Sequence, residues 1–409
     1  MAYLSSFTGP RILPSPDAVR LCRLTSKWLA VVLIARVLHW WTSRRQLCGA
    51  RQLASEFRAA LGAGGVESWR ASGWLEIDPH DHRVAHLLAD EQRLAALLLV
   101  GDGRGRGAGL GPRLVRWMLL GHAMLDQLGF YLTDGLHIGA RMLADRRQMA
   151  MVPKMAEGVR LFRCRAAVAS TGQQHQKRPV VLFVPGGAWG SCDPAHYYHL
   201  CMTLSATASV FLITYRVSPP EVEAQVGDVL FGVTLSLQAV REDPDSMDQG
   251  RVTLVAHSAG AHLSALALLR CPSLPLRACL LMAGPYDIDD HYQWEGRRAV
   301  ERVSWMGRAM GGQERFSAFS LPKILEQMQG LCVAPQLIVT HGLLDPIVPV
   351  SSSVRFYHAL KQACTVSSHI RFILNTGFGH GDYVVPLMML SHSKRDHLLG
   401  FFRSLEVIS

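Results

Sequence analysis

A serine stands at the apex of a predicted strand-to-helix turn in the segment Ala256-His257-Ser258-Ala259-Gly260. The apolar run RVTLV precedes this segment, and the helix-forming run AHLSALALL overlaps its end. A serine at such a turn has a strained backbone and an exposed hydroxyl, which suits a nucleophile. Strand and helix approach closely there, so the residues two before and two after the serine must be small, as Ala256 and Gly260 are. Ser258 is therefore the candidate nucleophile.

A candidate acid and a candidate base follow two later apolar runs. Asp345 comes just after PQLIVTHG, and His380 lies in the loop GFGHGD that follows HIRFILN. The chain order Ser258, Asp345, His380 is one of the known orders of a serine triad. In such a triad the histidine takes the serine proton and returns it to the leaving group, while the aspartate sets the histidine tautomer.

Other residues compete for these two roles. Asp287 also follows a predicted strand end and remains an alternative acid, whereas Asp382 is expected to order the loop around His380. The competing histidines are too close to the serine in sequence or lie in the predicted terminal helix: His257, His262, His392 and His397.

A glycine-rich turn, Pro185-Gly186-Gly187-Ala188-Trp189-Gly190, follows the apolar run VVLFV about seventy residues before the serine. Glycines let the main chain approach a developing oxyanion closely enough for its N–H groups to donate hydrogen bonds. We expect the oxyanion hole to comprise Gly186, Gly187 and Ala188 together with Ala259, next to the nucleophile. Trp189 is expected to contact substrate.

Six short apolar runs after residue 178 alternate with helix-like segments. Alternation of buried strands with helices predicts a mainly parallel, doubly wound α/β sheet, with ligands beyond the carboxyl ends of the strands. The predicted strands cover 180–185, 209–215, 251–257, 277–284, 335–342 and 369–375, and the helix-like segments include 226–240, 261–269 and 352–362. The same arrangement places the three candidate catalytic residues on one edge of the sheet.

Composition narrows the class of protein. The 409 residues carry a net charge of +10, with the basic excess in residues 1–178, which hold 25 Lys and Arg against 13 Asp and Glu. This excess is interleaved with Leu, Trp and Met, which suits an anionic membrane surface better than nucleic acid. The mean hydropathy is +0.14 without any run of 18 apolar residues, which excludes a polytopic transporter. The nine cysteines form no CxxC pair, so no metal site or disulfide framework is predicted.

The region before the sheet is predicted to be an extension, residues 1–111, that ends in the glycine-rich linker 101–111. Its apolar segment Trp28–Trp41 is interpreted as a membrane anchor, with a cleaved targeting segment, mitochondrial for example, or a buried helix as alternatives. Residues 112–409 form the predicted catalytic domain. Its amphipathic helices within 112–150 either pack on that domain or contact a membrane.

An insertion at residues 285–330 is rich in aromatic residues and methionine. It is predicted to form a small cap over Ser258 that either shapes an apolar pocket or simply packs internally. Its large apolar side chains are Trp294, Trp305, Met306, Met310, Phe316 and Phe319.

Taken together, these motifs resemble α/β-hydrolases of the hormone-sensitive-lipase-like type. Within that type, PGGAWGS, AHSAGAHL, GPYD with His291, HGLLDPIVP and GHGDYV are similar to segments of the isoprenylcysteine alpha-carbonyl methylesterases, with the arylformamidases as cousins. Two departures are Pro185, where that family has His, and Ala256, where it has Gly. The likeness spans roughly residues 110–405.

The resemblance implies a membrane-associated serine carboxylesterase without metal or cofactor. It would hydrolyse the carboxyl methyl ester of a prenylated cysteine, release methanol, and reside at the endoplasmic reticulum or Golgi. Two enzymatic alternatives are an arylformamidase and a general lipase or esterase. An alternative from another class is a catalytically silent membrane scaffold, which Pro185 would favour.

Overall fold

The computed structural model describes residues 177–409 apart from 218–220, 245–246, 366–368 and 390–392. Before residue 177 it describes shorter stretches: 48–49, 52–53, 55–56, 59, 74–76, 136, 138–140, 154–156 and 159–164. The predicted anchor Trp28–Trp41, the linker 101–111 and most of 112–150 lie outside the described residues. The division of the chain at residue 111 therefore stays a prediction.

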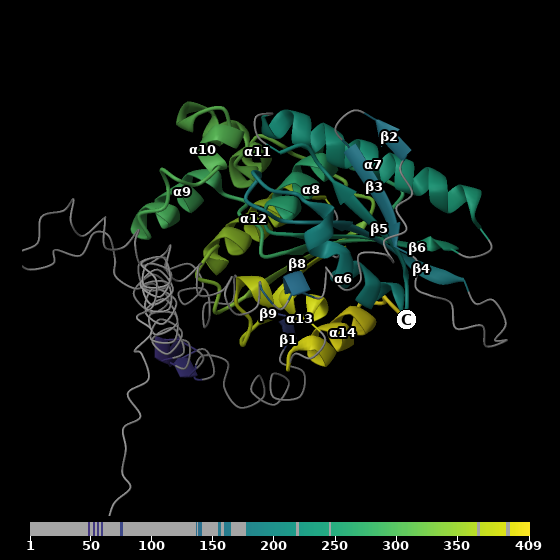
Figure 1. Cartoon of the computed structure of the whole chain (residues 1–409). Helices are drawn as coiled ribbons and strands as arrows, with labels where there is room; N and C mark the ends of the chain where they lie inside the picture. The colour runs from purple at the N-terminus through teal and green to yellow at the C-terminus, as the bar shows by residue number, and fades with distance from the viewer. Residues whose placement is uncertain are drawn as a thin grey trace, which may run out of the picture.

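A mainly parallel sheet forms the centre of the fold, as Figure 1 shows. Its nine strands follow the order β1-β9-β8-β7-β6-β4-β5-β3-β2, and the six from β9 to β5 are parallel. These six are the strands predicted from apolar runs, and their buried residues explain why the runs are continuous rather than alternating. Their bounds are β4 (Arg178–Val184), β5 (Ser209–Thr214), β6 (Met247–His257), β7 (Ala278–Met282), β8 (Gln336–Gly342) and β9 (Ile370–Asn375).

Three short antiparallel strands at the two edges were not predicted. At one edge β1 (Trp74–Glu76) pairs with β9, and at the other β3 (Val159–Cys164) pairs with β5 while β2 (Lys154–Ala156) pairs with β3. Strand β1 comes from the predicted extension and is held by the Glu76 carboxylate, which accepts two hydrogen bonds from Arg371 on β9 at 2.9 and 2.6 Å. A three-residue strand is too short to show a hydrophobic period, so only its partner strand defines it.

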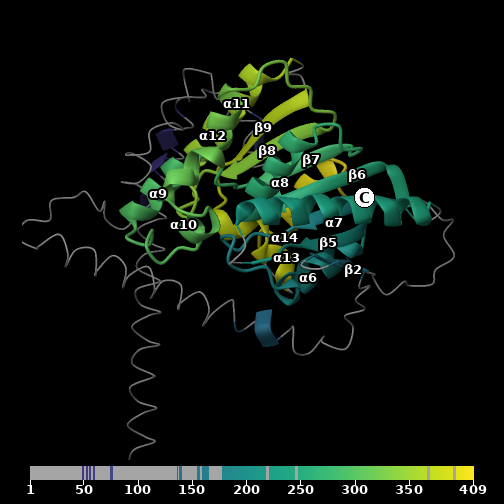
Figure 2. The ribbon, with the colours of Figure 1, turned by 90° about the horizontal axis from the view of Figure 1, so that it is seen from above.

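Helices cover both faces of the sheet, and alternate residues of β4 point into two separate cores. Val180, Leu182 and Val184 belong to the core that also contains residues of α7 (Val222–Glu242), α8 (Ala259–Arg270) and α12 (Val350–Ala363). Val181 and Phe183 belong to the core that also contains residues of α6 (Pro194–Ser205), α13 (Val385–Met388) and α14 (Arg395–Ser404). Figure 2 shows the same helices around the sheet from above. In the part of the chain that the structure describes, no helix is long and apolar enough to cross a membrane.

The insertion between β7 and β8 contains α9 (Ile288–Arg297), α10 (Met306–Ala309), the 3-10 helix η3 (Gln313–Ala318) and α11 (Leu321–Glu326). It contacts the two segments that carry Ser258 and Asp345: the Phe319 carbonyl bonds His262 on α8 at 2.8 Å, and the Trp294 indole donates to the Pro346 carbonyl at 3.1 Å. Of its six large apolar side chains, Trp305 is 41% exposed and the others are buried. Internal packing therefore accounts for most of its aromatic and methionine content.

Candidate active site

Ser258 occupies the sharp turn between β6 and α8. Its backbone has φ 54° and ψ −127°, a region that costs a non-glycine residue of order 1–3 kcal/mol. The Ser258 N–H donates to the Met282 carbonyl at 2.9 Å, which ties the turn to the end of β7. At Gly260 a Cβ atom would lie 2.3 Å from the Pro185 carbonyl oxygen, so this position requires glycine. The turn thus has the form that the sequence predicts for a nucleophile.

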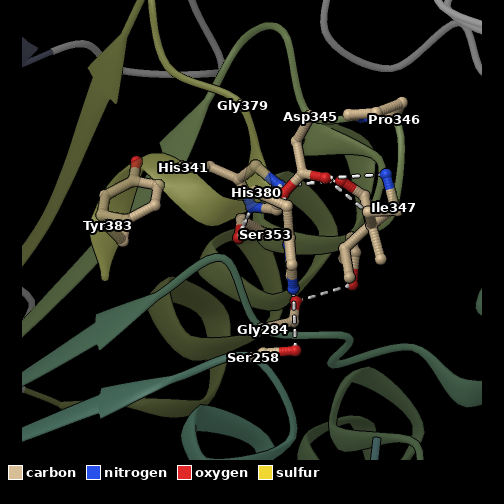
Figure 3. Close-up of polar contacts among 12 residues, drawn as sticks. Ser258, Gly284, His341, Asp345, Pro346, Ile347, Ser353, Gly379, His380 and Tyr383 are labelled. Atoms are coloured by element: carbon tan, nitrogen blue, oxygen red, sulfur yellow. Dashed lines mark hydrogen bonds and ion pairs between the residues drawn. The ribbon is translucent and has the colours of Figure 1, made fainter. Parts of the chain in front are cut away.

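The structure brings Ser258, His380 and Asp345 into one hydrogen-bonded line, drawn in Figure 3. Ser258 Oγ lies 2.9 Å from His380 Nε2, and His380 Nδ1 lies 2.7 Å from Asp345 Oδ2. In the tautomer that satisfies both contacts, the serine hydroxyl donates to Nε2 and the Nδ1–H group donates to the carboxylate. His380 is then oriented to accept the serine proton.

Asp345 is buried but fully hydrogen bonded. Its Oδ1 atom accepts the backbone N–H groups of Ile347 and Val348 at 2.8 and 2.9 Å, and its Oδ2 atom also lies 3.4 Å from Nε2 of His341. Burial alone would raise the pKa of Asp345, but the charge of His380 and the hydrogen bonds from His341 and His380 hold the pKa well below its usual value. The carboxylate therefore stays ionised beside the imidazole.

The glycine-rich turn after β4 lies directly against the serine. A Cβ atom on Gly186 would be 2.8 Å from Ser258 Cβ, and one on Gly187 would be 1.9 Å from the Ser191 carbonyl oxygen. Gly187, Ala188 and Trp189 all have positive φ, at 130°, 50° and 60°. The loop is strained and lies beside the Ser258 turn. The first N–H groups of α8, which also begins at this turn, lack intrahelical partners.

Trp189 corrects one expectation. Its side chain is 1% exposed and its Nε1–H group donates to His262 Nδ1 at 3.3 Å, with the two rings edge to face. His262 in turn donates its Nε2–H group to the Phe319 carbonyl, and burial lowers the pKa of His262 to about 4, so the ring stays neutral. The indole is thus part of the core, where it joins the loop to α8 and the insertion instead of contacting substrate.

Three polar side chains that sequence analysis did not identify hold the backbone of this loop. The hydroxyl of Tyr215 donates to the Pro185 carbonyl at 3.1 Å, and that of Tyr197 donates to the Gly186 carbonyl at 3.3 Å. Gln225 Nε2 donates to the Trp189 carbonyl at 2.8 Å. With these carbonyls hydrogen bonded, the backbone of the loop that begins at Pro185 is held in place. No local sequence pattern marks these three side chains, because each bonds a loop carbonyl 11 to 36 residues away in the chain.

The two competing aspartates have other hydrogen-bond partners. Asp287 caps α9 and its Oδ2 atom accepts from Arg355 Nε at 3.1 Å. Asp382 accepts the Gly379 N–H group at 2.7 Å and pairs with Lys394 at 2.6 Å, so it orders the His380 loop as predicted. Across the described residues, no group of three or more His, Cys, Asp or Glu side chains is placed to hold a metal ion.

Comparisons with known proteins agree with this architecture. The BD-FAE family model matches residues 168–360. Esterase LipC of Mycobacterium tuberculosis is 27% identical over 217 residues, which are 50% of this chain and 53% of that protein. The isoprenylcysteine alpha-carbonyl methylesterase of Arabidopsis thaliana is 28% identical over 226 residues, or 50% of this chain and 51% of that protein. The chain thus matches about half the length of these curated relatives.

A solved structure, that of the Francisella virulence factor BioJ, shares the fold. It superposes with a TM-score of 0.51 at 14% identity, covering 76% of this chain and 98% of that one. The sheet order and the turn at Ser258 fit the esterases named among the sequence relatives. The chain therefore has an α/β-hydrolase fold and is similar over about half its length to the isoprenylcysteine alpha-carbonyl methylesterases.

Proposed function

We propose that this protein is a serine carboxylesterase that acts through Ser258, His380 and Asp345. The observation that carries the proposal is the continuous line of hydrogen bonds from Ser258 Oγ through His380 to Asp345, which begins at a strained turn. A strained backbone and an aligned base are costly to maintain and are typical of an activated nucleophile.

In the first half of the reaction, Ser258 Oγ attacks the ester carbonyl carbon while His380 Nε2 takes its proton. The backbone N–H groups of Ala259 and of the loop Gly186 to Ala188 stabilise the negative oxygen of the tetrahedral intermediate, helped by the positive end of the α8 dipole. Asp345 stabilises the imidazolium. When the intermediate collapses, the bond to the alkoxy oxygen breaks, His380 protonates that oxygen, and the alcohol leaves.

In the second half, water attacks the acyl group on Ser258 and gives a proton to His380. Collapse of this second intermediate breaks the bond to Oγ, and His380 returns the proton to the serine. The products are a free carboxylate and the regenerated enzyme. Every proton passes through one atom, His380 Nε2.

For the substrate we propose the carboxyl methyl ester of a prenylated cysteine, with methanol as the leaving alcohol. The relatives named isoprenylcysteine alpha-carbonyl methylesterase, at 26–28% identity, support this choice. A prenylated substrate is bound to a membrane, so we further propose that the enzyme works at a membrane surface of the endoplasmic reticulum or Golgi. The basic, apolar composition of residues 1–178 supports membrane contact.

Turnover of three substrates tests this function: a farnesylcysteine methyl ester, a short aryl ester and N-formylkynurenine, each with the wild type and Ser258→Ala in detergent. We expect preference for the prenylated ester and a loss of about 10³-fold or more in kcat for Ser258→Ala, because triad members contribute losses of that order.

The other outcomes separate the alternatives. Activity on the aryl ester alone would retain the serine esterase and reject the prenyl substrate, and preference for N-formylkynurenine would indicate an arylformamidase. Turnover by Ser258→Ala equal to that of the wild type would reject Ser258 as the nucleophile. Inactivity of the folded wild type on all three would favour the scaffold alternative.

A further inference from the structure

We propose that His257, the last residue of β6, is a positioning residue that holds the base His380 in register with the nucleophile. Its Nε2 atom lies 3.0 Å from the main-chain carbonyl oxygen of His380, and the two imidazole rings are 4.8 Å apart with a tilt of 46°. His257 is too close to Ser258 in the chain to act as its base. The structure shows a different contact, to the backbone of the base.

The chemistry of this contact defines the protonation of His257. A carbonyl oxygen only accepts hydrogen bonds, so His257 Nε2 must carry the proton and donate. The ring is buried, and burial together with the nearby charge of His380 lowers the pKa of His257 to about 3. His257 is therefore a neutral donor at physiological pH and adds no charge beside the imidazolium that forms on His380.

The position of His257 in the chain makes this bond useful. It directly precedes Ser258, so a bond from its side chain to the His380 backbone links the residue before the nucleophile to the base itself. The segment that carries Ser258 is therefore joined to His380 by two hydrogen bonds. One runs from the His257 side chain to the His380 carbonyl, 123 residues away, and the other joins Ser258 Oγ to His380 Nε2, 122 residues away. Asp345 fixes the His380 ring, while His257 fixes the backbone from which that ring projects.

The other ring nitrogen of His257, Nδ1, lies beside the glycine-rich loop. A Cβ atom on Gly186 would lie 3.3 Å from His257 Nδ1 and 3.1 Å from the His257 carbonyl oxygen. The ring thus lies between the predicted oxyanion loop and the His380 loop. A shift of about 1 Å in a reacting group can cost about 10²-fold in rate, so loss of this bond should reduce turnover without affecting binding.

Two variants of similar size separate donation from packing: His257→Met removes the N–H donor, and His257→Gln keeps one. On a short aryl ester we expect His257→Met to lower kcat about 10- to 100-fold with KM changed less than about twofold, and His257→Gln to recover most of that loss. His199→Gln is the matched control, because His199 is a buried histidine of α6 that lies against Tyr198. We expect its kcat to stay within about threefold of the wild type. Melting temperatures show that each variant is folded.

The proposal rests on the triad, so Ser258→Ala is measured alongside. Wild-type kcat in folded His257→Met, or equal losses in the Met and Gln variants, would overturn the positioning role while an inactive Ser258→Ala leaves the triad intact. A loss in His199→Gln as large as that in His257→Met would also overturn it, since burial alone would then explain the effect. Full turnover by Ser258→Ala would instead overturn the proposed function.

Discussion

Replacing Asp345 by asparagine reverses the direction of the hydrogen bond at His380 Nδ1. Asp345 Oδ1 accepts two backbone N–H groups, from Ile347 and Val348, so the amide oxygen of the variant takes this place and its NH₂ group faces His380. An NH₂ group donates, so His380 Nδ1 must then accept and Nε2 must carry the ring proton. That tautomer cannot take the proton from Ser258 Oγ.

The structure also sets the size of the effect. In the transition state the imidazolium of His380 faces the carboxylate across the 2.7 Å between Nδ1 and Oδ2. With an effective dielectric constant of about 20, two opposite charges at this distance attract by about 6 kcal/mol. At about 1.4 kcal/mol per factor of ten, this corresponds to roughly four powers of ten in rate. Loss of the carboxylate in serine triads is of the same order, about 10⁴-fold.

The assay measures kcat for hydrolysis of a short aryl ester at neutral pH. A thermal melt shows that the variant is folded. Asp287→Asn is the matched control, because Asp287 is the alternative acid and bonds Arg355 rather than His380. We expect about a 10⁴-fold loss for Asp345→Asn and less than about threefold for the control. A folded Asp345→Asn within tenfold of wild-type kcat, or a larger loss in Asp287→Asn, would refute the assignment of the acid.

Two further predictions concern the loop and the buried histidines. Gly186→Ala places a Cβ about 2.8 Å from Ser258 Cβ, so we expect kcat to fall about 100-fold. The control Gly227→Ala lies in α7, has open space around its Cβ position, and should keep wild-type activity. Equal kcat values for the two variants would contradict the close packing of Gly186 against Ser258. His262 has its pKa lowered from 6.5 to about 4 by burial, so the unfolded chain binds a proton there that the folded chain does not. The neutral His262 ring therefore contributes fully to the free energy of unfolding above pH 6.5. This contribution is lost as the pH falls toward about 4, at about 1.4 kcal/mol per pH unit. Urea unfolding at pH 7 and 5 should therefore show a pH dependence about 2 kcal/mol smaller in His262→Gln, and an unchanged dependence would show that the ring titrates normally.

The amino-acid sequence by itself determined the features that depend on residues adjacent in the chain. Continuous apolar runs define six parallel strands because strands covered on both faces need no polar side. Small residues around Ser258 define the nucleophile turn, because a Cβ at Gly260 would clash with the end of β4. The positions of Asp345 and His380 just beyond strand ends place them on one edge, since parallel strands end together.

The tertiary structure decided which polar groups meet across that edge. The contact from His257 to the His380 carbonyl joins residues 123 apart, and the contact of Trp189 with His262 joins residues 73 apart. Tyr215 reaches the Pro185 carbonyl only because β5 lies beside β4 in the sheet. Strand β1 likewise exists only as a partner of β9. No local pattern encodes such contacts, because each depends on how distant segments pack and on where a buried donor finds its acceptor.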